Sequence, residues 1–413
     1  MRTGLIKSQA KRWPSLRLAF SFRGPALIFW AAMAVRLIYI AFLPEGYYFS
    51  DFQRYEQAAL SLLAGEGFGA EYLRPPLYPL FIALHYLLFG RFFFPMRISQ
   101  AVLAAVGSVL IFWIGRRLFH ERVGKIAAWI SVFYPYYVFI SGLLYPTLLS
   151  TVLHLGAVAA ILRAQDKHFL GWTAVSAACL VLAGLATPVS LAFLPLMLVW
   201  FLAFSTFPWR ERLIHASLAL LVVALGLLPW TYYNYQRTGQ IALIDARAKE
   251  HIPYFVQGDS SHAARKSAYE DRVSTILSNP GKFAVRTAKE FIHFWTFVPD
   301  RVVTKDPTYR EKAHQTDSRM QVEHSFTSPL LDYVSILTYG PVFILALAGL
   351  ILNRVRWRTL SLILLLLLSQ AIGYSFFFTQ VRYRLPVEFC LMILAASALD
   401  YVWLKYRGKP QPA

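Results

Sequence analysis

Residues 98–122, ISQAVLAAVGSVLIFWIGRRLFHER, form an apolar run that ends in a cluster of basic residues. The apolar part, 98–115, is long enough for a helix that crosses the hydrocarbon core of a bilayer. The arginines that follow it, Arg116, Arg117 and Arg122, are typical of a cytoplasmic turn between two spans. This stretch therefore predicts a membrane protein whose helices are joined by short basic loops.

The same alternation recurs along the whole chain. Of 413 residues, 57% are hydrophobic and only 15% are charged, whereas soluble domains average about 25% charged residues. We predict an all-α, polytopic membrane protein with about ten transmembrane helices, outer-face interfacial helices and one long outer loop. The predicted spans are 25–43, 98–115, 123–141, 147–162, 169–187, 188–206, 213–231, 330–352, 359–378 and 386–404.

The positions of the basic residues fix the predicted topology. A further apolar run, 77–89, is short for a span and contains Pro79. If it lies at the outer interface, the basic short loops that follow it face the cytoplasm, as the positive-inside rule requires. This rule also accounts for the net charge of +19, so nucleic-acid binding is not predicted. The predicted cytoplasmic segments are 1–24, 116–122, 163–168, 207–212, 353–358 and 405–413.

The predicted organisation follows from this topology. The basic N-terminus, 1–24, precedes a transmembrane region, 25–231, whose first outer segment is 44–97. The first apolar block is interpreted as a retained helix and not as a cleaved signal peptide. A long outer loop, 232–329, separates this region from the last spans, 330–404, and the tail, 405–413. Within the long loop, 281–297 has the apolar spacing of a helix lying on the membrane surface.

Segment 44–76 contains the residues most suggestive of chemistry. Asp51 follows Ser50 at the start of a helical stretch, 51–64, which ends near Gly65 and Gly67. An aspartate in this place can be a helix N-cap, which is common. It can also be a carboxylate that faces a substrate where the chain leaves the membrane.

Several motifs favour the second interpretation. Asp51-x-x-x-Tyr55, the turn Gly65-Glu66-Gly67-Phe68 and the run 74–79, RPPLYP, resemble the first outer loop of the GT-C glycosyltransferases. The resemblance is strongest to the branch of the protein O-mannosyltransferases and the lipid A aminoarabinose transferase, and it extends from about residue 25 to 404. Further matching motifs are Phe89-Gly90 with Arg97, Arg116-Arg117-Leu118-Phe119, Pro229-Trp230, Asn234-Tyr235 and Arg382-Tyr383-Arg384-Leu385-Pro386.

The resemblance implies a sugar donor linked to polyprenyl phosphate and Asp51 as the catalytic base. Such a base takes the proton of an acceptor hydroxyl during its attack. The leaving phosphate needs fixed cations, for which Arg74, Arg382 and Arg384 are the candidates because guanidinium groups match phosphate oxygens. Direct displacement would invert the anomeric carbon. Within the matching motifs, Tyr55 and Tyr383 are taken as substrate-binding residues.

The implied partners are a polyprenyl-phosphate sugar, an acceptor lipid, glycan or protein, and membrane lipids. The implied location is a bacterial inner membrane, with the active site facing the periplasm or exterior. Pro146 stands where family members often carry an acidic residue in the second outer loop, which argues against a divalent metal site of that type. No cofactor is predicted, since the long-loop histidines show no ligand spacing. These histidines are His251, His262, His293 and His314.

Two alternatives stay open. An outer-face polysaccharide polymerase or ligase would use a lipid-linked oligosaccharide but would not need an aspartate on a short helix after the first span. A lipid-linked sugar flippase or transporter would place polar groups near the midplane and is often built from repeats. Arg36 lies within the first span and is predicted to face the bundle; it is left out of the candidate site.

Overall fold

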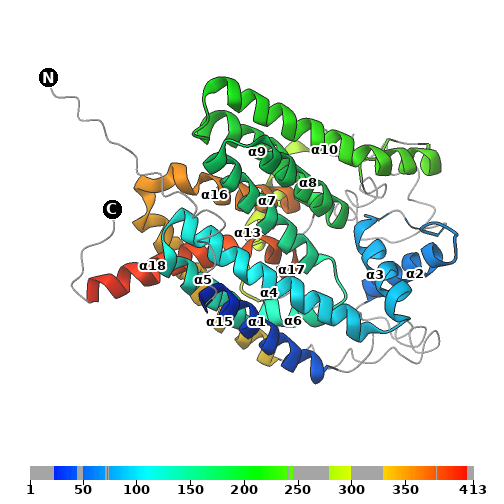
Figure 1. The fold of residues 1–413 in the computed structure, drawn as a ribbon, viewed down its shortest axis with the longest axis horizontal. Helices are drawn as coiled ribbons and strands as arrows, with labels where there is room; N and C mark the ends of the chain where they lie inside the picture. The colour runs from blue at the N-terminus through cyan, green and yellow to red at the C-terminus, as the bar shows by residue number, and fades with distance from the viewer. Residues whose placement is uncertain are drawn as a thin grey trace.

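The computed structural model describes residues 23–43, 50–69, 72, 74–239, 241–244, 279–298, 329–377 and 379–406, and this part contains helices and no strand. Figure 1 shows the long helices running side by side, with α2 and α3 set apart at one end. The elements are α1 (Arg23–Ala41), α2 (Ser50–Leu63), α3 (Leu77–Phe89), α4 (Phe93–Leu118), α5 (Glu121–Phe133), α6 (Pro135–Gly142), α7 (Thr147–Lys167), α8 (Leu170–Ala186), η1 (Pro188–Ala192), α9 (Phe193–Val199), η2 (Trp200–Phe204), α10 (Trp209–Thr238), α13 (Pro280–His293), α15 (Pro329–Leu352), η3 (Arg354–Arg356), α16 (Trp357–Ser375), α17 (Val381–Arg384), η4 (Leu385–Val387) and α18 (Glu388–Tyr406).

The predicted all-helical membrane architecture is confirmed. Within the described ranges, seven helices are long and apolar enough to cross a membrane, and α5 with α6 makes an eighth if the bent pair is one span. The predicted fifth and sixth spans correspond to shorter apolar helices, Leu170–Ala186 and Pro188–Phe204. The count of ten therefore stays a prediction that depends on these two short segments.

Segment 44–92 begins and ends at the same end of the bundle. Arg97, in the first turns of α4, donates a hydrogen bond from Nη1 to the carbonyl oxygen of Leu43 at 3.2 Å. The exit of α1 and the entry of α4 are therefore neighbours, so α3, between them, does not cross. We call this the site end; it comprises α2, α3, 142–146 and 379–384, and Figure 1 shows α2 and α3 there.

The opposite end, here called the basic end, gathers the basic loops 116–122, 163–168, 207–212 and 353–358. Arg117 pairs with Asp166, its Nε lying 3.0 Å from both carboxylate oxygens. His168 lies 2.8 Å from the Glu211 carboxylate, which joins α7 to the start of α10. The loops predicted to share the cytoplasmic face thus share one end of the molecule.

Arg36 explains how a charge is accommodated inside the first span. Pro135 bends α5 against α6 by 50° and has no N–H to offer the carbonyl of Ser131, four residues before it. Arg36 is fully buried and donates to Ser131 O at 3.2 Å and to Val132 O at 3.3 Å. The arginine faces the bundle, as predicted, and replaces the backbone donor that the proline removes.

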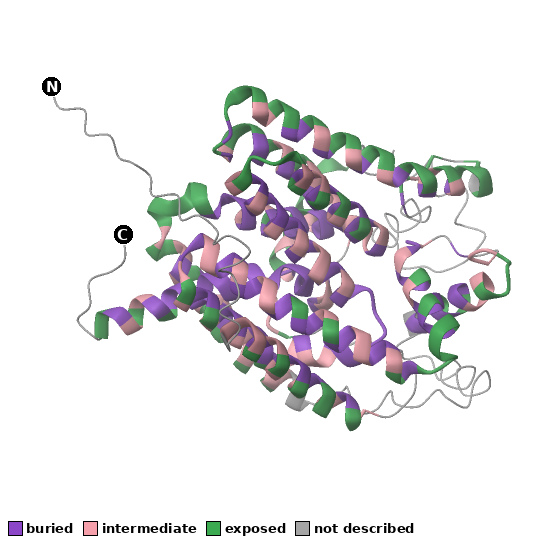
Figure 2. Cartoon of the chain, in the orientation of Figure 1, coloured by how far each residue is buried: buried purple, intermediate pink, exposed green. Residues whose placement is uncertain are grey.

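The buried surface lies between the helices, and the outward faces are apolar too. Figure 2 shows the buried residues along the inner helices and exposed ones along the outer side of α10. There, Leu221, Leu225 and Leu228 are exposed, as expected for a face in contact with lipid. Glycine permits the closest helix contacts: a Cβ on Gly124 of α5 would lie 2.5 Å from the Phe112 carbonyl of α4.

The helix predicted over 281–297 is present as α13, which ends at His293. Helix α10 continues to Thr238, past the predicted span end at 231. It does so because its last turns contact other parts of the site end, as described below. Of the four long-loop histidines, only His293 lies within the described residues.

Candidate active site

Helix α2 carries the predicted catalytic base at its start. Asp51 is its second residue, and the Asp51 side chain lies outside the described part of the structure. The helix buries Phe52, Tyr55 and Ala59 against α3 and α4, so its apolar face fixes its orientation. Three glycines with positive φ follow, as predicted at the first two, and they end the helix: Gly65 (79°), Gly67 (65°) and Gly69 (82°).

Glu56 fastens α2 to α3. Its carboxylate accepts a hydrogen bond from Tyr86 Oη at 2.5 Å and pairs with Arg91 Nε at 2.8 Å. The Glu56 side chain is only 3% exposed. Its oxygens are therefore committed to holding the helix pair together.

The glycine turn after α2 packs on the end of α10. The Phe68 ring lies 5.0 Å from Trp230 and 5.7 Å from Tyr233. Arg237 Nη1 donates to the Gly69 carbonyl at 2.8 Å. The part of α10 beyond the predicted span therefore contacts the turn that follows α2.

The second loop of the site end is held by Gln100. Its Nε2 donates to the carbonyls of Ser141 at 3.1 Å and Leu143 at 2.8 Å. Its Oε1 accepts from Tyr78 Oη at 3.4 Å. Burial, and then the neighbouring tyrosines, raise the pKa of Tyr78 well above its ordinary value, so that it stays a neutral donor. These contacts fix the loop that presents Tyr145.

Two of the predicted phosphate-binding arginines, Arg74 and Arg382, each contact one of two neighbouring tyrosines. The Arg74 guanidinium lies 5.6 Å from the Tyr55 ring. The Tyr55 ring lies 6.5 Å from the Tyr145 ring. The guanidinium of Arg382 lies 5.1 Å from the ring centres of both Tyr145 and Tyr383 and completes the array. The residues Asp51, Tyr55, Arg74, Tyr145, Arg382 and Tyr383 are referred to below as the candidate site.

Arg384 lies in a different environment from Arg382. It is 0% exposed, stacks 3.5 Å above the Tyr339 ring and donates from Nε to Glu388 at 2.6 Å. Its Nη1 donates to the carbonyls of Phe294 at 3.0 Å and Thr296 at 2.8 Å. These partners assign it to holding the fold together, so we do not carry Arg384 forward as a phosphate ligand.

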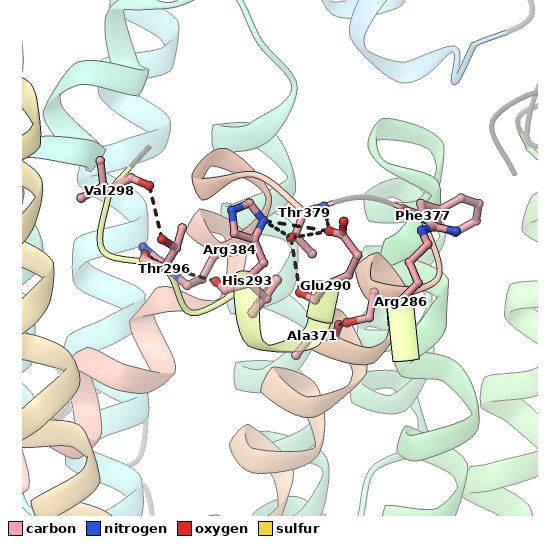
Figure 3. A network of polar contacts seen from close by, with 11 residues as sticks. Arg286, Glu290, His293, Thr296, Val298, Ala371, Phe377, Thr379 and Arg384 are labelled. Carbon is pink, nitrogen blue, oxygen red and sulfur yellow. Dashed lines mark hydrogen bonds and ion pairs between the residues drawn. The ribbon is translucent and has the colours of Figure 1, made fainter. Parts of the chain in front are cut away.

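Helix α13 is fastened to the segment that precedes α17 (Figure 3). The Glu290 carboxylate accepts from both the backbone N–H and the hydroxyl of Thr379, each at 2.8 Å. His293 Nδ1 lies 2.9 Å from the same hydroxyl, and Arg286 donates to the Phe377 carbonyl. Helix α13, from the predicted long outer loop, thereby contacts the segment that carries Arg382.

An apolar groove lies between α13 and α16, next to this junction. Its cavity volume is about 440 Å³. The wall from α13 includes Phe283 and Phe291, and the wall from α16 includes Ile372, with Phe376 just after it. The groove is therefore suited to a hydrocarbon chain.

No cluster of three or more histidine, cysteine or acidic side chains occurs within the residues described. Pro146 follows Tyr145 in the second loop, and Tyr145 contacts Arg382 through its ring.

Sequence reasoning missed Tyr145, Gln100 and the contact between Glu290 and Thr379. Tyr145 carried a usable signal, since it is a tyrosine beside a proline in a short loop between two apolar helices. Glu290 and Thr379 are 89 residues apart in the sequence. No local sequence pattern predicts a contact over such a separation.

Comparisons with known proteins agree with this fold. A family profile described as Dolichyl-phosphate-mannose-protein mannosyltransferase matches residues 73–233. The undecaprenyl phosphate-alpha-4-amino-4-deoxy-L-arabinose arabinosyl transferase of Pseudomonas paraeruginosa (strain DSM 24068 / PA7) is 29% identical over 248 residues, 56% of this chain and 44% of that protein. The enzyme of the same name from Pseudomonas aeruginosa (strain LESB58) is 28% identical over 250 residues. The chain thus spans less than half the length of these curated relatives.

Solved structures with the same fold include ArnT from Cupriavidus metallidurans bound to undecaprenyl phosphate. It has a TM-score of 0.59 and 17% identity, over 93% of this chain and 61% of that one. The Archaeoglobus fulgidus oligosaccharyltransferase in the apo form has a TM-score of 0.61 and 12% identity, over 95% and 52%. The chain is therefore similar in fold to these integral-membrane glycosyltransferases. Part of its sequence is also similar to the mannosyltransferase family profile and to the two arabinosyl transferases.

Proposed function

We propose that this chain transfers a sugar from a polyprenyl-phosphate donor to an acceptor hydroxyl at the outer face of a bacterial inner membrane. The observation that carries the proposal is the run of contacts from Arg74 through Tyr55 and Tyr145 to Arg382, which includes the helix whose second residue is Asp51. Two guanidinium groups from distant segments suit a phosphate, whose oxygens they can bind in a forked geometry.

The apolar groove between α13 and α16 supports the lipid part of the donor. Its wall includes Phe376, six residues before Arg382 in the sequence, so a polyprenyl chain in the groove would lie next to the segment that leads to this arginine. Two further observations favour the same donor class. ArnT from Cupriavidus metallidurans was solved with undecaprenyl phosphate bound, and the Pseudomonas relatives are named for an undecaprenyl-phosphate-linked sugar.

The proposed reaction is a single displacement. The acceptor oxygen forms a bond to the anomeric carbon, the bond from that carbon to the phosphate oxygen breaks, and the acceptor proton passes to Asp51. Arg74 and Arg382 stabilise the polyprenyl phosphate as its negative charge develops. Retention would need a second carboxylate as nucleophile. Glu56, one of the acids near Asp51 in the sequence, is held by Tyr86 and Arg91, so we do not expect it to be that nucleophile, and we propose inversion.

The test compares sugar transfer by membranes that contain wild type or Asp51→Asn, supplied with a panel of radiolabelled polyprenyl-phosphate sugars. A general base typically contributes about 100- to 10,000-fold, so we expect a loss of that size at equal protein level. Glu66→Gln is the matched control, because Glu66 is an exposed acid in the turn after α2. Unimpaired transfer by Asp51→Asn would remove Asp51 as the base.

A further inference from the structure

The segment 377–384 is held at two places by α13 and the turn that follows it. At the first, Arg286 donates to the Phe377 carbonyl, and Glu290 accepts two hydrogen bonds from Thr379. At the second, Arg384 donates to the carbonyls of Phe294 and Thr296. Figure 3 shows Arg286, Glu290, Phe377 and Thr379 of the first attachment, and Thr296 and Arg384 of the second.

Arg382 lies between the two attachments. It is three residues from Thr379 and two from Arg384, and it is partly exposed while Arg384 is fully buried. On a helical turn, residues two apart do not face the same side. Burying Arg384 therefore turns Arg382 the other way, toward Tyr145 and Tyr383.

The buried pair between Arg384 and Glu388 is poorly explained by stability alone. Glu388 is 1% exposed, and Glu388 Oε2 and Arg384 Nη2 are buried without a hydrogen-bond partner in the part of the chain that the structure covers. Buried ion pairs can often be replaced by apolar side chains with no loss of stability. What this pair does provide is a fixed orientation of the chain at residue 384.

We propose that Glu290 and Glu388 are positioning residues that act through Thr379 and Arg384 to fix Arg382 at the leaving phosphate. The inference rests on the proposed function, since it gives these residues a part in that reaction. A displacement of about 1 Å in a reacting group can cost on the order of 100-fold in rate. Two attachments so close to Arg382 would prevent such a displacement.

Thr379→Val removes the hydroxyl and keeps the shape of the side chain, so it loosens the first attachment alone. We expect kcat to fall about 10-fold, with KM for the donor changing less, and Thr379→Ser to restore the rate. Thr338→Val is the matched control, because the Thr338 hydroxyl donates within its own helix to Val334 O at 2.6 Å. If Thr338→Val lost as much rate as Thr379→Val, the positioning role that acts through Thr379 would be overturned.

A double-mutant cycle tests whether the effect passes through Arg382. In an Arg382→Ala background we expect Thr379→Val to lower the rate of sugar transfer by less than a further factor of about two, because the group that Thr379 positions is already absent. A full 10-fold loss in that background would mean that Thr379 acts by another route and would overturn the proposal.

Hydrogen exchange of the peptide 376–385 tests the attachment without any transfer assay. The Thr379 amide donates to Glu290, so we expect Glu290→Ala to speed its exchange at least about 10-fold and Arg382→Ala to leave it unchanged. Equal exchange in wild type and Glu290→Ala would overturn the positioning role even if sugar transfer is found. Failure of wild type to transfer any sugar would instead count against the proposed function, while the exchange result would still decide the attachment.

Discussion

Both ends of the bundle place arginines against carboxylates and aromatic rings, but the elements that these contacts join differ. At the basic end, Arg117 pairs with Asp166, and Arg122 lies 3.2 Å from Asp400 and 3.8 Å from the centre of the Trp403 ring. These contacts join long helices to one another. At the site end, Arg91 and Arg384 also pair with carboxylates, whereas Arg74 and Arg382 contact tyrosine rings of the candidate site. We therefore expect substitutions at the basic end to act on stability, and substitutions of Arg74 and Arg382 to act on sugar transfer.

The largest expected effect on the rate of sugar transfer comes from Arg382→Ala. Removing one preorganised donor to developing negative charge costs on the order of 100- to 1,000-fold in rate, so we expect a loss in that range for sugar transfer. Arg54→Ala is the control, because Arg54 is an exposed arginine on α2. Steady-state transfer at equal protein level measures both. Equal loss in the two variants would show that overall charge, and not position, matters.

A smaller effect is expected at Arg74. Arg74→Lys keeps the charge but not the forked geometry, so we expect transfer to fall about 10-fold and the KM for the donor to rise. Arg74→Ala should lose more, about 100-fold, because it removes the charge as well. Initial rates over a range of donor concentrations separate the two variants. If Lys and Ala were equally impaired, the fork and not the charge would be the whole contribution.

Sugar transfer should fall when Tyr145 loses its ring, but not when it loses only its hydroxyl. A cation–π contact contributes about 0.5–2 kcal/mol, which corresponds to about 2- to 30-fold. We therefore expect Tyr145→Leu to reduce transfer within that range and Tyr145→Phe to stay near wild type. A severe defect in Tyr145→Phe would instead assign the hydroxyl a direct role with the substrate.

The smallest effect on transfer should come from the basic end. Asp400 is buried and lies 3.0 Å from His120 and 3.2 Å from Arg122. Asp400→Asn weakens a charged contact of about 1–3 kcal/mol, so we expect a lower midpoint of thermal unfolding and transfer within about twofold of wild type. A large loss of transfer without a change in the unfolding midpoint would contradict the division between the two ends.

The sequence could predict the helices and the side of the bundle on which each loop lies. Hydrophobic run length and the position of basic residues are local signals, and they led correctly to the shared end of the basic loops. The bend between α5 and α6 was also readable, because Pro135 stands within the predicted span 123–141. The extension of α10 to Thr238 was not, since it depends on contacts with Phe68 and Gly69.

The candidate site was predictable only in part. Positive charge at the predicted outer face singled out Arg382 and Arg384 together, although they point into different environments. One local signal could have separated them: Glu388 follows Arg384 by four residues, the spacing of an ion pair on a helix. The contact between Arg382 and Tyr145 could not be foreseen, because it joins loops brought together only by the packing of the bundle.

Arg36 has a consequence for how the chain enters the membrane. An arginine at mid-helix costs about 2.5–3.5 kcal/mol on scales of insertion by the translocon, so α1 is a poor candidate for release into lipid by itself. Within α1 its guanidinium donates to Ala32 O, and its other acceptors, Ser131 O and Val132 O, become available only once α5 is present. These acceptors lie about a hundred residues later in the chain, so α1 would be accommodated fully only after that segment has been made.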